Sequence, residues 1–196
     1  MIRALGKNKK QLRPQNDFYC TPFSLTWELL KKQNIKEAWE PACGQGSIST
    51  PLEKNNIDVF CSDIDSNFDP TNVSRQFFEF TIAPKKTIIS NPPFSLWDPF
   101  VFHAKFLEIE KIIFIGKTDY FSAAGRSKSG IWNHLHHVYI FNRKVDYQTP
   151  YREDGLFHVG AMTSAWFVWD IGYEGSPIID IIDVQQYAKL GQYKKS

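Results

Sequence analysis

Short apolar segments alternate with helical segments over residues 35–115, and this alternation constrains the fold more than any other feature of the chain. Helices are expected after Thr21, from Ser47 and over residues 98–108. Apolar and β-branched residues predict the intervening strands at 35–40, 58–62, 76–80, 87–90 and 111–115. Strands that alternate with helices form a doubly wound, parallel sheet, because each crossover helix covers one face of it.

The later part of the chain changes character. Residues 137–141 and 165–170 are rich in aromatic and β-branched side chains, and the sequence between them is irregular and polar. We expect these two segments to be the last strands of the sheet, paired as an antiparallel hairpin at one edge. The predicted fold class is therefore α/β, with a doubly wound, mostly parallel sheet and an antiparallel edge hairpin.

Composition limits the classes of protein that remain. A chain of 196 residues, 42% of them hydrophobic, is expected to form one domain with a real core. The net charge of +2 permits a nucleic-acid partner without requiring one. Three cysteines do not make a disulfide framework, and no apolar run reaches the roughly 20 residues of a membrane span. We expect a cytoplasmic protein that does not enter a membrane; its oligomeric state stays unknown, with a monomer as the default.

Two turns at strand ends are suited to binding a nucleoside. The first runs from Glu40 to Gly46, where Gly44 and Gly46 allow a tight turn and a close approach of the backbone to a ligand. The second ends the next strand at Asp63, about 20 residues further on, where an acidic side chain accepts hydrogen bonds from ribose hydroxyls. Ile64 would pack against the adenine ring. The first turn lacks the glycine and lysine spacing of phosphate loops, so phosphate is not the preferred ligand.

A third turn, Asn91-Pro92-Pro93-Phe94, follows an apolar strand and is the most specific signal in the chain. An amine on an aromatic ring is a poor nucleophile because its lone pair is delocalised. Acceptors on both of its N–H bonds, here Asn91 Oδ1 and the Pro92 carbonyl, would free that lone pair. The prolines stiffen the turn, which holds the acceptors in place before reaction. Phe94 offers a flat face for stacking a base.

With these turns, the chain resembles the S-adenosylmethionine-dependent DNA adenine-N6 methyltransferases, particularly the small phage and prophage type. The resemblance covers nearly the whole chain and includes the stretch 17–22, similar to an aromatic-Thr-Pro motif that closes over the methionine end of the cofactor, and the late strand 164–170. It implies the Rossmann-like class I methyltransferase fold, S-adenosylmethionine as the cofactor, double-stranded DNA as the partner, and Asn91, Pro92, Pro93 and Phe94 as the catalytic residues.

The same resemblance assigns a set of cofactor-binding residues. One position departs from the family pattern, because Gln76 stands where an aspartate usually contacts the adenine amino group. Its side-chain carbonyl is still able to accept that hydrogen bond. The implied cofactor-binding residues are Phe18, Tyr19, Thr21, Pro22, Glu40, Pro41, Ala42, Gly44, Gly46, Asp63, Ile64, Gln76 and Phe77.

No segment is long enough for a separate target-recognition domain, so residues 1–196 are expected to form a single methyltransferase domain that begins with a basic arm at 1–16. Base reading would then fall to loops at 117–136 and 142–160, which predicts a short target site or loose specificity. Their basic and aromatic residues suit contacts with phosphates and with the gap left by a flipped base. The expected DNA-binding residues are Lys117, Tyr120, Phe121, Arg126, Lys128 and Arg143.

Several alternatives stay open. The Asn-Pro-Pro-Phe turn also occurs in enzymes that methylate RNA adenine or guanine, or a protein glutamine. A protein of another class, a DNA-binding protein that has lost catalysis, is also compatible with the departure at Gln76. A metal site is not expected. His134, His136 and His137 lead directly into an apolar strand, and methyl transfer by this route needs no metal.

Overall fold

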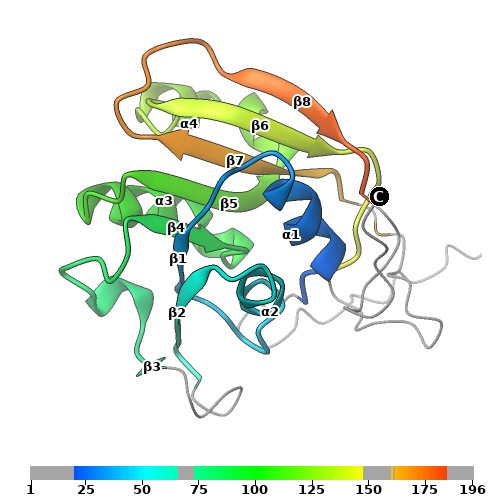
Figure 1. Ribbon diagram of the computed structural model, residues 1–196. Coiled ribbons are helices and arrows are strands. Elements are labelled where there is room, and N and C mark those ends of the chain that lie inside the picture. The colour runs from blue at the N-terminus through cyan, green and yellow to red at the C-terminus, as the bar shows by residue number, and fades with distance from the viewer. Residues whose placement is uncertain (1–19, 66–72, 148–159, 161, 185–196) are drawn as a thin grey trace, which may run out of the picture.

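A computed structural model of the chain describes residues 20–65, 73–147, 160 and 162–184 (Figure 1). Eight strands form one sheet in the order β3-β2-β1-β4-β5-β7-β6-β8. Their bounds are β1 (Glu37–Glu40), β2 (Asp58–Asp63), β3 (Val73–Ser74), β4 (Thr87–Ser90), β5 (Lys111–Lys117), β6 (Leu135–Phe141), β7 (Ser164–Asp170) and β8 (Ile178–Ile182).

The described strands are parallel to one another except for β7, which is antiparallel to both of its neighbours, β5 and β6. The mostly parallel sheet and the β6–β7 antiparallel pair confirm the predicted fold class. The sequence analysis did not predict β8, which pairs in parallel with β6 and forms the outer edge of the sheet. Most of its isoleucines are exposed, so the strand lacks the buried apolar pattern that identified the others.

Helices cover both faces of the sheet. Figure 1 shows α1 (Phe23–Leu30) and α2 (Ser49–Glu53) in front of it, and α3 (Trp97–Phe106) and α4 (Ala124–Lys128) behind. Two apolar clusters result. In the first, Leu25 and Leu29 of α1 pack with Trp166 of β7. In the second, Val101 and Ala104 of α3 pack on the opposite face of the sheet. A doubly wound sheet requires apolar packing on both of its faces, and these two clusters provide it.

The strand predicted at 76–80 is wrong. The structure has the short strand β3 before it, and residues Phe77–Glu79 form a 3₁₀ helix, η2. Phe77 and Phe80 both reach the ring of Trp39, with centroid distances of 5.2 and 4.7 Å. Residues three apart lie on one side of a 3₁₀ helix, whereas in a strand they would point to opposite faces. Packing against Trp39 therefore favours the helical turn.

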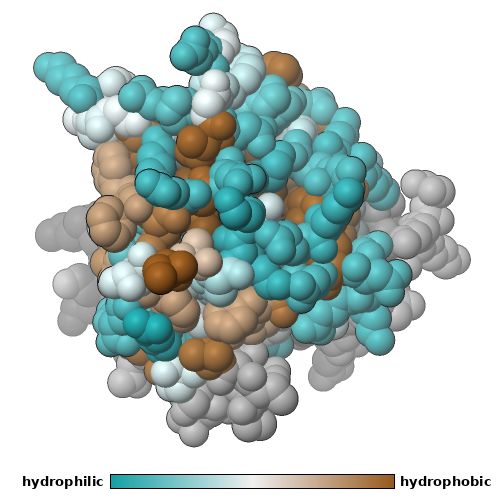
Figure 2. Space-filling view, turned by 60° about the vertical axis from the view of Figure 1, so that its left-hand side comes forward, coloured by the Kyte–Doolittle hydropathy of each residue, from teal (hydrophilic) through white to brown (hydrophobic). Residues whose placement is uncertain are grey.

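Hydrophobic side chains are unevenly distributed on the surface. On the face drawn in Figure 2 they gather toward the left, and hydrophilic side chains cover the right. Among the described residues, Ile82 and Phe106 are the most exposed large apolar side chains, at 81% and 70%. None of the helices in the described ranges combines the length and the apolar character that crossing a membrane requires.

Candidate active site

The three turns singled out in the sequence lie at one edge of the sheet. They follow β1, β2 and β4, which are neighbours in the order β2-β1-β4 and run parallel, so their carboxyl ends meet at the same edge. Between β1 and β4 the order of the strands reverses direction. Crevices at such reversal points are where open α/β sheets bind ligands.

The glycine turn after β1 is held against the end of β2 by Asp63. Gly44 and Gly46 have φ angles of 50° and 74°, in the left-handed region that glycine adopts without steric cost. Asp63 Oδ2 accepts the backbone N–H of Gly44 at 2.8 Å, and Oδ1 accepts that of Asp65 at 2.9 Å. A single buried carboxylate therefore fixes the position of the turn relative to β2.

Glu40, the last residue of β1, is a buried carboxylate. Its Oε2 accepts the backbone N–H of Ser49, the first residue of α2, at 2.7 Å. Burial raises the pKa of Glu40 well above its usual range, and the nearby Cys61 adds to that effect. The chain thus maintains a costly acidic group at the end of β1, where the glycine turn begins, and groups of this kind concentrate at functional sites.

The turn after β4 is linked to the segment before α1. Asn91 Nδ2 donates a hydrogen bond to Thr21 Oγ1 at 3.1 Å, across 70 residues of sequence. Asn91 Oδ1 is shielded from solvent and has no hydrogen-bond partner among the described residues. Leaving a buried acceptor unsatisfied costs about 1–3 kcal/mol. The amide is thus anchored by its nitrogen, and its oxygen is left to accept a donor from outside the chain.

Phe94 has one aromatic and one charged neighbour. The edge of its ring meets Tyr147 at a centroid distance of 6.1 Å and an interplanar angle of 81°. The Nζ atom of Lys117, at the end of β5, lies 5.1 Å from the centroid of the ring. A cation over an aromatic face is attracted by the negative face of the ring. Lys117 therefore places a positive charge over the ring of Phe94.

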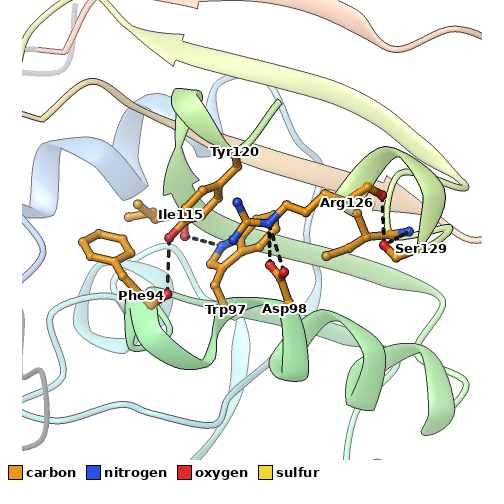
Figure 3. Close-up of polar contacts among 8 residues, drawn as sticks. Phe94, Trp97, Asp98, Ile115, Tyr120, Arg126 and Ser129 are labelled. Atoms are coloured by element: carbon orange, nitrogen blue, oxygen red, sulfur yellow. Dashed lines mark hydrogen bonds and ion pairs between the residues drawn. The ribbon is translucent and has the colours of Figure 1, made fainter. Parts of the chain in front are cut away.

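Side chains from η4, α3 and α4 lie beside this turn and are linked to it by polar contacts, as Figure 3 shows. The Tyr120 hydroxyl donates to the Phe94 carbonyl at 3.4 Å, and the Arg126 guanidinium lies 4.0 Å from the centroid of the Tyr120 ring. Arg126 Nε also contacts both Asp98 oxygens, at 2.8 and 3.0 Å. The backbone of the turn is thus connected through Tyr120 to an ion pair between the two helices.

Trp97, the first residue of α3, locks the same layer onto the sheet. Its Nε1 donates to the Ile115 carbonyl in β5 at 2.8 Å. The indole lies against the backbone of Gly116, where an added Cβ would come within 2.9 Å of the ring. The signal for these supporting roles was present in the sequence, because Trp97 and Asp98 follow the Asn-Pro-Pro-Phe turn within four residues. The sequence analysis did not assign Trp97, Asp98 or Tyr147 to the site.

The predicted loop after β5 is largely helical in the described range. It forms the 3₁₀ helix η4 (Thr118–Ser122) and then α4. Tyr120 is buried, and Arg126 contacts Asp98, so both hold the protein's own structure together. Phe121 is partly exposed and stacks on Trp132 at 4.7 Å.

Lys128 and Arg143 are exposed. Lys128 ends α4, and Arg143 follows β6. Both are therefore accessible to a phosphate. Most of the second predicted loop, residues 148–159, lies outside the described residues.

The structure gathers most, but not all, of the predicted cofactor-binding residues. Ile64 is 62% exposed at the end of β2, and Gln76 is exposed after β3. Phe77 lies apart from them, because its ring is buried in the core and stacks on Phe100. Phe18 and Tyr19 lie outside the described residues. Those placed at the ends of β1, β2 and β4, or in the segment before α1 that contacts Asn91, are Thr21, Pro22, Glu40, Pro41, Ala42, Gly44, Gly46, Asp63, Ile64 and the turn Asn91, Pro92, Pro93 and Phe94.

Comparison with solved structures identifies the fold. No protein-family model and no curated protein sequence matches the chain. A protein of Pyrococcus horikoshii assigned as an RNA methyltransferase aligns over 84% of this chain and 91% of its own, with a TM-score of 0.55 and 19% identity. A dimethyladenosine transferase of Plasmodium falciparum aligns over 78% and 62%, with a TM-score of 0.52 and 12% identity.

A modification subunit assigned to a type I restriction enzyme of Vibrio vulnificus is also similar, with a TM-score of 0.53 and 13% identity. The alignment covers 78% of this chain but only 44% of the Vibrio subunit. These identities are low, so the likeness defines the fold alone. The chain has the Rossmann-like fold of class I methyltransferases, with β8 added at the edge beyond β6.

Proposed function

We propose that the chain is an S-adenosylmethionine-dependent methyltransferase that modifies the N6 amino group of adenine in DNA. The observation that carries this proposal is the state of Asn91. Its amide nitrogen is anchored to Thr21, and its oxygen is a buried acceptor without a partner among the described residues. An acceptor preorganised in this way matches the N–H of an incoming amine.

The residues at the ends of β1 and β2 fit a nucleoside cofactor. The left-handed glycines bring the backbone close to a ligand, and Asp63 keeps acceptor capacity for ribose hydroxyls beyond its two backbone contacts. The exposed side chain of Ile64 offers an apolar surface for an adenine ring. S-adenosylmethionine supplies an electrophilic methyl group on a sulfonium. The residues proposed to hold it are Thr21, Glu40, Gly44, Gly46, Asp63 and Ile64.

The chain's part in the reaction is to position the target base. Adenine flipped out of a duplex stacks on Phe94, and Asn91 Oδ1 and the Pro92 carbonyl accept its two amino hydrogens. These contacts direct the lone pair of N6 at the methyl group. One N–C bond forms as the methyl–sulfur bond breaks, and the surplus proton on the nitrogen then leaves to water. Positioning and fixed acceptors supply the main rate enhancement.

Lys117 supports a nucleic-acid substrate. Its ammonium lies beside the Phe94 ring, where a flipped nucleotide would bring its phosphate close to a positive charge. Lys128 and Arg143 add exposed positive charge. A protein glutamine would bring no phosphate to these residues. RNA shares the phosphate and the adenine, so methylation of RNA adenine or guanine is the second candidate.

The proposal is tested by incubating the purified protein with labelled S-adenosylmethionine and either unmethylated duplex DNA or structured RNA. The nucleic acid is then digested and its methylated nucleoside identified. We expect N6-methyladenine in DNA, and an Asn91→Ala variant that binds the cofactor normally but transfers no label. If RNA is labelled and DNA is not, the substrate of the enzyme is RNA. Cofactor binding without transfer to either would reject the activity, and DNA binding without cofactor binding would support the inactive DNA-binding alternative.

A further inference from the structure

Strand β6 carries one extra residue opposite β7. Leu135 pairs with Trp169, but it is His137, not His136, that pairs with Val168. The inserted residue, His136, forms a β-bulge, and bulges redirect side chains. Consecutive residues of a regular strand point to opposite faces. Here the rings of His136 and His137 instead lie side by side, with centroids 3.9 Å apart.

Asp170 completes a cluster with the two histidines. It is the last residue of β7, and its Oδ2 lies 2.7 Å from His136 Nδ1. One nitrogen of each histidine and one carboxylate oxygen lie within 4.8 Å of one another. His137 Nδ1 is shielded from solvent and has no hydrogen-bond partner in the described part of the chain. A buried, unsatisfied ring nitrogen in such a cluster calls for an explanation.

We propose that His136, His137 and Asp170 bind a divalent first-row transition-metal ion such as Zn²⁺, with water as the fourth ligand. Two imidazoles and a carboxylate form a ligand set that suits Zn²⁺, whereas Mg²⁺ and Ca²⁺ are usually bound by oxygen ligands alone. Ligand atoms around a tetrahedral zinc ion lie about 3.3 Å apart. The candidate ligand atoms lie within 4.8 Å of one another, so binding requires side-chain rotations that adjust them to that spacing.

Neighbouring side chains orient two of the three ligands. Lys111 Nζ donates to Asp170 Oδ1 at 2.7 Å and to Gln33 Oε1 at 2.9 Å, so the carboxylate is fixed through the oxygen that does not face His136. The Tyr173 ring stacks on His136 at 4.0 Å. Such outer contacts typically hold metal ligands in place. The ammonium of Lys111 also repels a cation, which predicts a moderate affinity.

The proposed metal site and the candidate active site lie at opposite ends of the strands. Lys111 begins β5 and Asp170 ends the antiparallel β7, whereas the catalytic turns follow the ends of the parallel strands. The ion would therefore have a structural role, connecting the bulge of β6 to the end of β7. A ligand that binds only the folded state stabilises it. Metal binding is expected to raise the melting temperature.

The test is a titration of tag-free, metal-free protein with Co²⁺, whose visible spectrum reports tetrahedral nitrogen and oxygen ligation. We expect saturable binding of one ion per chain, displacement by Zn²⁺, and a rise in melting temperature with either ion. In His136→Gln and His137→Gln variants we expect the affinity to fall by about 100-fold or more, because loss of an outer contact alone costs about 10- to 100-fold. Asp170→Asn, nearly identical in shape, should behave similarly.

Two histidines outside the cluster provide matched controls. His103 lies in α3, and its Nε2 contacts the Phe80 carbonyl; His158 lies outside the described residues. His103→Gln and His158→Gln are expected to leave Co²⁺ affinity unchanged, and circular dichroism checks that each variant is folded. The proposal is overturned if wild-type protein shows no saturable tetrahedral Co²⁺ spectrum, or if folded cluster variants bind Co²⁺ as tightly as these controls.

Discussion

The contact between Asn91 and Thr21 shows how a single hydrogen bond can determine the geometry of an acceptor. Thr21 is 1% exposed, and its hydroxyl holds the amide nitrogen of Asn91. An amide group is planar, so fixing the nitrogen also fixes the direction of Oδ1. In the proposed reaction Asn91 is catalytic, because it contacts the reacting amine. Thr21 is proposed to hold the cofactor as well, but it acts on the amine only through Asn91, so toward the amine it is a positioning residue.

A Thr21→Val variant keeps the shape of the side chain and removes this hydrogen bond. A net hydrogen bond is worth about 0.5–1.5 kcal/mol, so kcat at saturating cofactor should fall by up to about tenfold. Thr21→Ser should restore most of the rate. A Thr21→Val enzyme with the wild-type kcat, or a Thr21→Ser enzyme as slow as the valine variant, would show that the hydroxyl does not position Asn91.

Gly116 is a second residue whose identity is dictated by a neighbour. The Trp97 indole occupies the position that a Cβ would need, at 2.9 Å, and it is held there by its bond to Ile115. Gly116→Ala should lower the free energy of unfolding by about 1–3 kcal/mol, as overpacked cores do. Urea unfolding measures this. Gly125, with no heavy atom within 4 Å of an added Cβ, is the control, and its alanine variant should be close to wild type in stability.

At the scale of elements, α3 and α4 are connected by the ion pair between Asp98 and Arg126. Its side chains are 35% and 21% exposed, so solvent screening leaves a coupling of about 0.5–1 kcal/mol. A double-mutant cycle with Asp98→Ala and Arg126→Ala measures that coupling from urea unfolding. The same cycle with Lys128, an exposed cation on α4, should give a coupling near zero. Equal coupling energies in the two cycles would show that the ion pair between Asp98 and Arg126 does not connect α3 to α4.

The sequence predicted helices and strands well where the pattern of apolar residues along the chain fits one type of secondary structure. The strands β1, β2, β4 and β5 were expected within two residues of their observed bounds. Predictions failed where a tertiary partner decides the local structure. Trp39 draws Phe77 and Phe80 into a 3₁₀ turn, and the pairing with β7 places a bulge at His136. Neither partner is visible in the local pattern.

The candidate site was predictable to a similar extent. The turns that contain Gly44, Asp63 and Asn91 meet at one edge because consecutive parallel strands end there. Spacing places Asp98 near the catalytic turn, but its interaction with Arg126, and the approach of Lys117 to Phe94, depend on side-chain conformations that the spacing does not predict.

At the scale of the whole molecule, the buried Glu40 lowers the stability of the fold and is proposed to serve cofactor binding. Its raised pKa means that the folded state holds the proton more tightly than the unfolded state does. The cost of ionising it is therefore absent below the ordinary value of 4.5 and grows as the pH rises toward the folded-state pKa. A chain selected for stability alone would not keep a carboxylate there. Under the proposed function, binding of the positively charged cofactor would favour the ionised form of Glu40.

Glu40→Gln removes the charge and keeps an oxygen to accept the Ser49 N–H. At pH 7 we expect the variant to be more stable than wild type, with the difference vanishing below pH 4.5, where wild-type Glu40 is protonated in both states. Cofactor affinity, measured by calorimetry, should fall. Urea unfolding at both pH values gives the stability difference. A variant that is less stable than wild type by the same amount at both pH values would mean that shape, and not the buried charge, governs this position.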